Sequence, residues 1–218
     1  MLDTNGFCVV RRITTRAELK SIRDILDFLV SRSYASVLKD HAPVQLDMPV
    51  LEAPALGETR LFTNSLRIAR QILGDTGEWV GDQALFKPSG GRETPWHQDE
   101  AYWPVGFEYR ALSIWLALDP VDKRNGCLHF KTGSHRSQVL PHHVTSVIEG
   151  FPELEVDRCP KSGTVHCALE PGDATIHWSR TLHSASRNRT GLCRRAYALG
   201  FACPPLAKPH EKELTEQK

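Results

Sequence analysis

From Trp79 onward the chain is built of short apolar runs separated by turn residues, and this pattern restricts the fold more than any other feature of the sequence. The runs are rich in β-branched and aromatic residues, which favour strands, and glycine, proline or asparagine lies between them. The runs are residues 84–86, 112–118, 127–130, 164–169, 174–178 and 197–202. Many short strands joined by turns are typical of a β-sandwich or a jelly roll.

The first eighty residues have a different pattern. Residues 6–11 predict one short strand, and Thr15 and Glu18 after it have the spacing of a helix capping box. Apolar residues then recur every three or four positions from residue 17 to about residue 30, and again over residues 60–73, which predicts two amphipathic helices. Residues 33–58 contain prolines and little periodicity, so we expect a loop there that can include a short helix.

Length and composition favour one domain. A chain of 218 residues can bury one sizeable core. We expect a single domain over residues 1–207, with a β-helix core at about 80–203, and a solvated tail over residues 208–218, where three lysines and three glutamates accompany one leucine.

Charge and cysteine usage exclude several partners and compartments. With 27 basic and 26 acidic residues, the chain has no charge excess that would attract nucleic acid or an anionic membrane. The six cysteines lack C-x-x-C spacing, and the sequence shows neither a secretory leader nor 18 consecutive apolar residues. We therefore expect reduced thiols and a soluble cytoplasmic protein.

One short segment suggests a metal site. His97 and Asp99 are two residues apart, so their side chains project from the same face of an extended strand. His183 follows a predicted late strand, which can lie beside an early one in a closed double-sheet barrel. Two histidines and one carboxylate fill one face of an octahedron and leave three positions for a bidentate cosubstrate and O₂. Alone, the H-x-D pair also fits a surface histidine beside a surface aspartate.

Arg194 strengthens the metal interpretation. It lies eleven residues after His183, on what is predicted to be the next strand. A guanidinium there can bind the distal carboxylate of a dicarboxylic cosubstrate with two hydrogen bonds. Arg195 has to face the other way, because adjacent strand residues alternate between the two faces. We expect Arg195 to meet solvent or a surface carboxylate, in an interaction worth roughly 0–1 kcal/mol.

Taken in order, these motifs resemble the phytanoyl-CoA dioxygenase family of Fe(II)- and 2-oxoglutarate-dependent oxygenases. The matching segments are residues 85–88, 97–103, 115–119, 125–128, 133–135, 171–173 and 183–197. The resemblance implies a mainly β fold, a double-stranded β-helix of the jelly-roll, cupin-like type. Helices from the N-terminal third would pack outside one of its sheets.

The resemblance also implies roles for individual residues. The positions that match the family's iron ligands are His97, Asp99 and His183. Arg194 would pair with the far carboxylate of 2-oxoglutarate. The other positions that match cosubstrate contacts are Lys87, Trp115 and Gln83.

Some side chains near these motifs allow more than one interpretation. Ala185 stands where many relatives have a hydroxyl two residues after the second histidine. Ser184 or Ser186 would have to supply that hydrogen bond to the cosubstrate, or none does. Tyr102 and Trp103 can line the substrate pocket or pack in the core.

Two further histidines receive structural interpretations from the sequence. His135 is expected to be a structural hydrogen-bonding residue. His177 lacks a spacing that argues for metal binding and is expected to face the barrel wall. Neither is assigned to the metal site.

The reaction implied is oxidation of a small molecule. With Fe(II), 2-oxoglutarate and O₂, such an enzyme hydroxylates an unactivated C–H bond and releases succinate and CO₂. Modification of a secondary metabolite is our hypothesis for the substrate.

Two other classes of protein stay open. One is a cupin-like metal-binding protein without turnover, against which Arg194 argues. The other is a metal hydrolase with the same triad, against which Lys87, Trp115 and Arg194 argue together. Asp99 disfavours halogenation, because such enzymes lack the carboxylate.

Overall fold

Two antiparallel sheets form the body of the molecule in a computed structural model, which describes residues 1–39, 43–148 and 151–208. The larger sheet has six strands in the order β1 (Phe7–Val10), β11 (Ala174–Trp178), β6 (Ala111–Ala117), β13 (Arg194–Ala202), β3 (Glu78–Lys87) and β2 (Val44–Asp47). The smaller sheet has four in the order β10 (Thr164–His166), β7 (Leu128–Lys131), β12 (His183–Ala185) and β4 (Thr94–His97).

The remaining elements are short hairpins and helices. The hairpins pair β8 (His142–Ile148) with β9 (Phe151–Val156), and β5 (Phe107–Glu108) with β14 (Leu206–Ala207). The α-helices are α1 (Leu2–Asn5), α2 (Arg16–Lys39), α3 (Pro49–Glu52) and α4 (Arg60–Leu73). The 3₁₀-helices are η1 (Pro54–Leu56), η2 (Asp99–Tyr102) and η3 (Ser134–Arg136). None of the helices in the described ranges is both long and apolar enough to cross a membrane.

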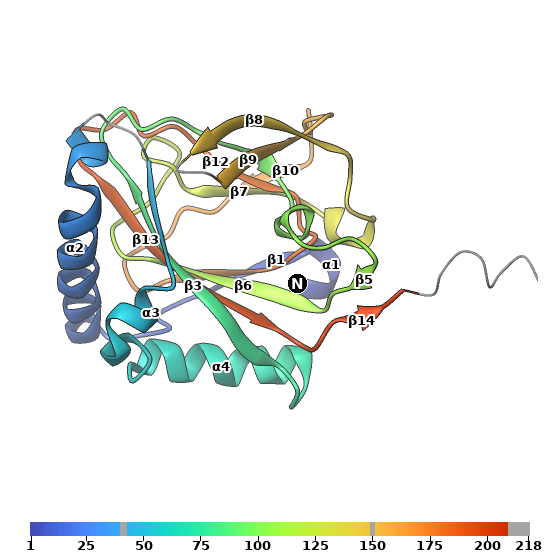
Figure 1. The fold of residues 1–218 in the computed structure, drawn as a ribbon, viewed down its shortest axis with the longest axis horizontal. Coiled ribbons are helices and arrows are strands. Elements are labelled where there is room, and N and C mark those ends of the chain that lie inside the picture. The colour runs from blue at the N-terminus through green and yellow to red at the C-terminus, as the bar shows by residue number, and fades with distance from the viewer. Residues whose placement is uncertain (40–42, 149–150, 209–218) are drawn as a thin grey trace, which may run out of the picture.

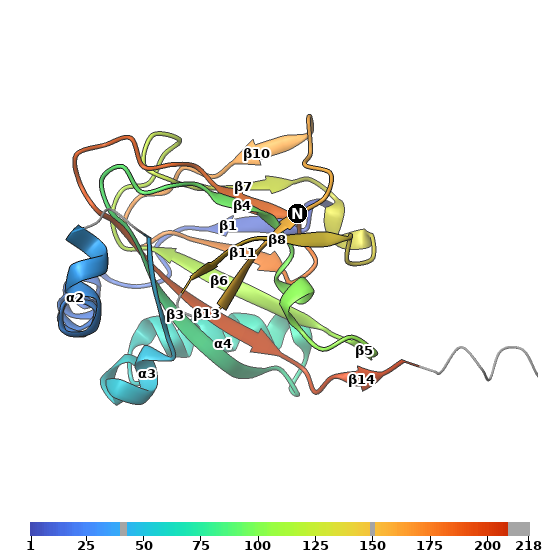
Figure 2. The same cartoon turned by 45° about the horizontal axis from the view of Figure 1, so that its top comes forward.

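The six-stranded sheet buries both of its faces. Figures 1 and 2 show α2 and α4 on the side that faces away from the smaller sheet. That outer face packs on the helices through side chains such as Ile114, Tyr197 and Leu199. The inner face packs on the smaller sheet through side chains such as Trp115 and Phe130. The predicted fold, a double-stranded β-helix with N-terminal helices outside one sheet, is therefore confirmed.

One acidic side chain joins the two long helices. The backbone N–H of Glu18 donates to Thr15 Oγ1 at 3.2 Å, as the capping-box spacing predicts. The Glu18 carboxylate, however, accepts hydrogen bonds from Arg60 N at 2.6 Å and Leu61 N at 3.0 Å, at the start of α4. A carboxylate at a helix N-terminus satisfies orphan N–H groups and complements the helix dipole. Glu18 therefore fixes α4 against α2 on the outside of the sheet.

The segment between α2 and α4 contains more secondary structure than the sequence predicts. Helix α4 has the bounds that its periodicity indicates, but α2 extends past residue 30 to Lys39, with a non-helical backbone at Tyr34 (φ −127°, ψ 19°). Strand β2, within the expected loop, adds an edge strand to β3. Of the tail expected at residues 208–218, residues 209–218 lie outside the described ranges.

Candidate metal centre

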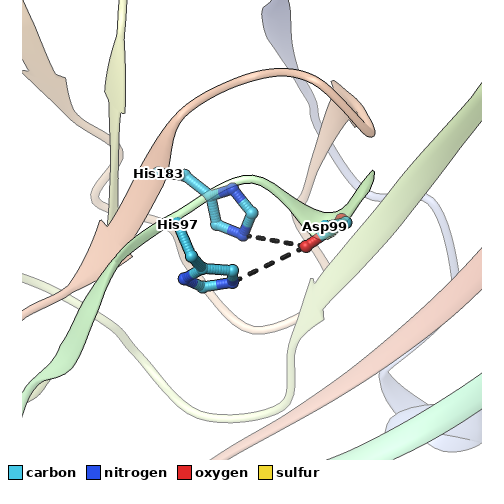
Figure 3. Close-up of side chains that lie close together, drawn as sticks. All are labelled: His97, Asp99 and His183. Atoms are coloured by element: carbon cyan, nitrogen blue, oxygen red, sulfur yellow. Dashed lines mark ion pairs between the residues drawn. The ribbon is translucent and has the colours of Figure 1, made fainter. Parts of the chain in front are cut away.

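The three predicted metal ligands meet at the junction of two neighbouring strands. His97 ends β4 and His183 begins β12, and the two residues are directly paired in the smaller sheet. Asp99 lies beyond the end of β4, as the first residue of η2. The intervening Gln98 is still extended (φ −116°, ψ 132°), so the alternation of side chains continues to Asp99. Figure 3 shows both imidazoles directed at the Asp99 carboxylate.

The distances suit a single metal ion. Asp99 Oδ1 lies 3.6 Å from His97 Nε2 and 3.5 Å from His183 Nε2, and the three ligand atoms lie within 4.8 Å of one another. The Nδ1 atom of His97 is 2.8 Å from Pro95 O, and that of His183 is 2.8 Å from Thr181 O. Because each Nδ1–H donates to a backbone carbonyl, each Nε2 lone pair is free for a metal, as is usual in histidine metal sites.

The charges at the centre also favour metal binding. Burial raises the pKa of Asp99, but the imidazole of His183 and hydrogen bonds from His177 and His97 outweigh it and hold that pKa well below its usual range. Burial and the charge of His97 lower the pKa of His183 well below its usual value. Burial lowers the pKa of His97, but Asp99 outweighs it and raises that pKa, so protons compete with a metal for this nitrogen and metal binding weakens as the pH falls.

Two buried side chains fix the segment that carries Asp99. Gln98 Nε2 donates to Arg180 O at 2.8 Å, and Gln98 is fully buried. On the other side, the Glu100 carboxylate accepts from Arg180 Nε at 2.9 Å and from Ser179 Oγ at 3.2 Å. Since the residues on both sides of Asp99 are anchored to the loop before β12, the carboxylate is positioned before any metal binds.

Further inside the barrel, Arg194 and Lys87 form a buried basic pair. They are register partners on β13 and β3, and only 4% of Arg194 and 2% of Lys87 is exposed. Arg194 Nη1 donates to Leu85 O at 3.3 Å, and the guanidinium lies 5.3 Å from the centre of the Trp115 ring. Within the described ranges, Arg194 Nε has no hydrogen-bond partner. A buried cation without a carboxylate partner is costly, and this one is therefore suited to an anionic ligand.

Lys87 adds a second buried basic side chain beside Arg194. Its Nζ donates to Ser186 O at 2.9 Å, and to Ala185 O and Thr94 Oγ1 at 3.3 Å each. Burial and the neighbouring positive charge of Arg194 lower the pKa of Lys87 to about 6. A carboxylate bound here would stabilise both charges. The side chains at this end of the barrel thus fit the dicarboxylate that the sequence predicts.

Two other predicted cosubstrate contacts are placed less favourably. Strand alternation puts Gln83 on the same face of β3 as Lys87, but its Nε2 donates to Asp47 Oδ1 at 2.9 Å. Ser184 lies on the opposite face of β12 from His183, where its hydroxyl donates to Thr94 O at 2.7 Å and lies 3.0 Å from His129 Nε2. This placement does not support a cosubstrate contact for Ser184.

The two aromatic residues with open assignments have different surroundings. The Tyr102 ring meets His97 edge-on, with centroids 6.0 Å apart, and its hydroxyl accepts a hydrogen bond from Leu154 N of β9 at 3.0 Å. Tyr102 thus lies beside a metal ligand and contacts the β8–β9 hairpin. Trp103 packs edge-on against Tyr109, with centroids 4.9 Å apart. Of the two, Tyr102 is the better placed to border a substrate.

His177 is the residue that sequence reasoning missed. It does not simply face the barrel wall, because its Nε2 lies 3.5 Å from Asp99 Oδ2. Ser113, its register partner on β6, donates its hydroxyl to the same oxygen at 3.0 Å. The alternation of the run 174–178 could have indicated a histidine on the inner face, but not which residue it meets. His135, by contrast, contacts Asp3 O at 3.1 Å, away from the metal ligands.

Arg195 points out of the barrel and forms a stronger network than expected. Its Nε and Nη2 donate to the two oxygens of Asp119 at 2.9 and 2.7 Å, and its Nη1 donates to Asp27 Oδ2 of α2 at 2.7 Å. Its side chain is only 25% exposed. Arg195 thus faces away from Arg194, as expected, but it binds two carboxylates where one weak surface interaction was expected. Its bidentate bond is to Asp119, just after β6, and its single bond to Asp27 joins β13 to α2.

The fold and the site define a β-helix protein in which two histidines and one aspartate form a candidate metal centre, with a buried pair of basic side chains, Arg194 and Lys87, in the same barrel. The model of the family "Phytanoyl-CoA dioxygenase (PhyH)" matches residues 2–196, so the chain belongs to this family. The mouse peroxisomal phytanoyl-CoA dioxygenase is 29% identical over 225 residues, which cover 91% of this chain and 65% of that protein. The chain thus spans about two thirds or less of the length of the curated relatives it matches.

Solved structures agree with this assignment. EvdO2 from Micromonospora carbonacea var. aurantiaca, crystallised with 2-oxoglutarate, is 30% identical and superposes with a TM-score of 0.85 over 97% of this chain and 93% of its own. The epimerase SnoN, crystallised with Fe³⁺, alpha-ketoglutarate and nogalamycin RO, is 19% identical, with a TM-score of 0.75 over 95% of this chain and 83% of its own. The second likeness supports the fold alone.

Proposed function

We propose that this chain is an Fe(II)- and 2-oxoglutarate-dependent oxygenase that hydroxylates an unactivated C–H bond of a small molecule and releases succinate and CO₂. The observation that carries the proposal is the buried pair of Arg194 and Lys87, in which Lys87 bonds to Thr94 and Ala185 on the two strands that carry His97 and His183. A metal-binding protein without turnover has no need for a buried pair of basic side chains. A hydrolase has no need for it either, because water is its only second reactant.

Each group at the site has a defined task in this reaction. His97, Asp99 and His183 would hold Fe(II), which when bound supplies the activation of O₂ coupled to decarboxylation of 2-oxoglutarate. Arg194 and Lys87 bind the far carboxylate and orient the cosubstrate toward the metal. Their burial excludes water from the cosubstrate, and Tyr102 borders the position where a substrate approaches.

The substrate hypothesis is the one drawn from the sequence. SnoN, crystallised with nogalamycin RO, and a carbocyclase from nogalamycin biosynthesis are 19% and 17% identical, so they support the fold alone. A relative from Stutzerimonas stutzeri is described as a probable alpha-ketoglutarate-dependent hypophosphite dioxygenase, with 27% identity over 146 residues. We favour a secondary metabolite as the substrate. We also propose a cytoplasmic location, which is consistent with the six free thiols.

The proposal predicts metal-dependent binding of the cosubstrate. Under anaerobic conditions, the purified protein should bind one Fe(II) per chain, and it should bind 2-oxoglutarate only when Fe(II) is present, with a weak visible absorption band. Admission of O₂ should then produce succinate slowly, and faster with a substrate from a metabolite screen. If the protein shows neither metal-dependent binding nor succinate formation, it is not an oxygenase.

The low pKa of Lys87 predicts that the protein takes up a proton when the cosubstrate binds. Its pKa of about 6 leaves it mostly neutral at pH 7.5, and a bound carboxylate favours the charged form. We expect uptake of close to one proton at pH 7.5 and little at pH 5, where Lys87 is already protonated. Calorimetric titrations in phosphate and Tris buffers would show this as a difference in observed enthalpy. Lys87→Met should remove the difference, and equal enthalpies for the wild-type protein would contradict the prediction.

Turnover without substrate should modify an aromatic side chain near the metal. When no substrate is present, the side chain nearest the three metal ligands would be oxidised in its place. Tyr102, whose ring contacts His97, is expected to gain one oxygen atom, whereas Trp103 on Tyr109 is expected to stay intact. Trp115, under Arg194, is the second candidate for modification. Peptide mass spectrometry after prolonged turnover tests this, and three unmodified aromatics would assign them to packing.

A further inference from the structure

The two oxygens of Asp99 have different surroundings. Oδ1 faces His97 Nε2 at 3.6 Å and His183 Nε2 at 3.5 Å. Oδ2 accepts a hydrogen bond from Ser113 Oγ at 3.0 Å and lies 3.5 Å from His177 Nε2. Ser113 and His177 are direct register partners on β6 and β11, so two neighbouring strands of the larger sheet present both groups to one oxygen. One oxygen therefore faces the other ligands, and the second faces two potential donors.

The surroundings of His177 indicate which of its nitrogens carries the proton. The ring is 3% exposed, and it packs against Phe130 and His183 with centroids 5.1 and 4.5 Å away. Its Nδ1 has no hydrogen-bond partner among the residues that the structure describes. A neutral imidazole has one N–H, and burying it without an acceptor is costly. The proton therefore belongs on Nε2, which lies 3.5 Å from Asp99 Oδ2.

We propose that Ser113 and His177 are positioning residues that keep Asp99 a monodentate metal ligand. This inference rests on the metal site of the proposed function. A carboxylate can bind a metal through one oxygen or through both. If Oδ2 also bound, it would occupy one of the three positions that a bidentate cosubstrate and O₂ require. The hydrogen bond from Ser113 and the His177 Nε2 atom 3.5 Å away oppose this, because both direct donor groups at the Oδ2 lone pairs.

The role proposed for Ser113 and His177 differs from simply holding the Asp99 side chain in place. If Ser113 and His177 only held the Asp99 side chain in place, their loss would weaken metal binding, and cosubstrate binding at saturating metal would not change. If they prevent bidentate binding, their loss leaves metal binding nearly unchanged or tighter. The freed Oδ2 then competes with 2-oxoglutarate for a coordination position. The two affinities, measured separately, distinguish these roles.

The test uses cobalt(II), which occupies such sites without supporting turnover. The variants are Ser113→Ala, His177→Phe and the double variant, and the phenylalanine keeps the ring that packs on Phe130. Ser113→Thr restores a hydroxyl and serves as the conservative rescue. Ser65→Ala removes another buried serine hydroxyl, on the outer helix α4, and serves as the matched control. Calorimetry gives the affinity for cobalt(II) and then, at saturating cobalt(II), the affinity for 2-oxoglutarate.

We expect Ser113→Ala and His177→Phe each to weaken 2-oxoglutarate binding at saturating cobalt(II) by about tenfold to a hundredfold. Because the freed Oδ2 can itself bind the metal, cobalt(II) affinity should fall by less than about threefold, and not by the roughly ten- to hundredfold that is usual when a supporting partner is lost. Ser113→Thr and Ser65→Ala should behave like the wild type. Unchanged 2-oxoglutarate affinity in both single variants would overturn the inference alone. A wild-type protein that binds no 2-oxoglutarate with metal would overturn the proposed function and the inference with it.

Discussion

Replacing His183 with alanine is expected to abolish metal-dependent binding of 2-oxoglutarate and all succinate formation. His183 is 5% exposed and directly paired with His97. In the alanine variant, only water could take the position of the lost nitrogen, and water is a weaker ligand than imidazole. Loss of a partner outside the ligand shell typically costs ten- to hundredfold in metal affinity, and loss of a ligand should cost more than about a hundredfold. Anaerobic titration with Fe(II), followed by 2-oxoglutarate, measures both losses.

The control for this experiment is another histidine of the same chain. His143 on β8 is exposed and pairs with Asp157 at 2.9 Å, away from the three ligands. His143→Ala should keep wild-type affinities for Fe(II) and 2-oxoglutarate. Circular dichroism would establish that the His183→Ala protein is folded. If folded His183→Ala bound Fe(II) within a few-fold of the wild type, His183 would not be a ligand.

The shared orientation of His97 and Asp99 could be predicted from local sequence, because strand geometry fixes it. Two residues that are two apart share a face wherever the backbone is extended, and Gln98 is extended although β4 ends at His97. The position of His183 beside His97 needed a different argument, since 86 residues separate them. Only the closed topology of the barrel brings β12 next to β4. The resemblance to the family supplied that topology, and periodicity did not.

His177 shows where sequence reasoning failed. Alternation along β11 places it on the inner face, but its partner depends on the register between β11 and β6. That register also places Ser113 beside it, and no motif links the two residues in sequence. Side chains that support a metal ligand come from several strands, so their spacing along the chain carries little information.

The strands that the sequence did not predict, β8, β9 and β2, have a similar explanation. The β8–β9 hairpin carries exposed Val144 and Val147 among polar residues, so it lacks the apolar run that identifies a buried strand. Strand β2 has only Val44 and Leu46 as buried positions, within a segment bounded by prolines. Edge strands and exposed hairpins are specified by their pairing partners more than by their own pattern.

Substitutions at Arg194 and Arg195 test which side chains of β13 face the interior of the barrel. Arg194→Gln should weaken 2-oxoglutarate binding by roughly 30- to several thousand-fold, because losing one partner of a buried charge pair costs on the order of 2–5 kcal/mol. Fe(II) affinity should stay nearly unchanged, since none of the three metal ligands contacts Arg194 in the described structure. Arg195→Gln should leave both affinities unchanged. It removes the bidentate bond to Asp119, so it should lower the free energy of unfolding by about 1–3 kcal/mol.

Titrating both variants with 2-oxoglutarate under anaerobic Fe(II) conditions, together with urea unfolding, separates the two roles. The two residues differ by one position on β13, so each variant serves as the other's control for a lost positive charge. A large loss of cosubstrate affinity in Arg195→Gln, with Arg194→Gln near wild type, would mean that the register of β13 is shifted by one residue. Every inward assignment on that strand would then reverse, and Tyr197, which now donates to Asp82 at 2.6 Å on the helix side, would face the cosubstrate instead.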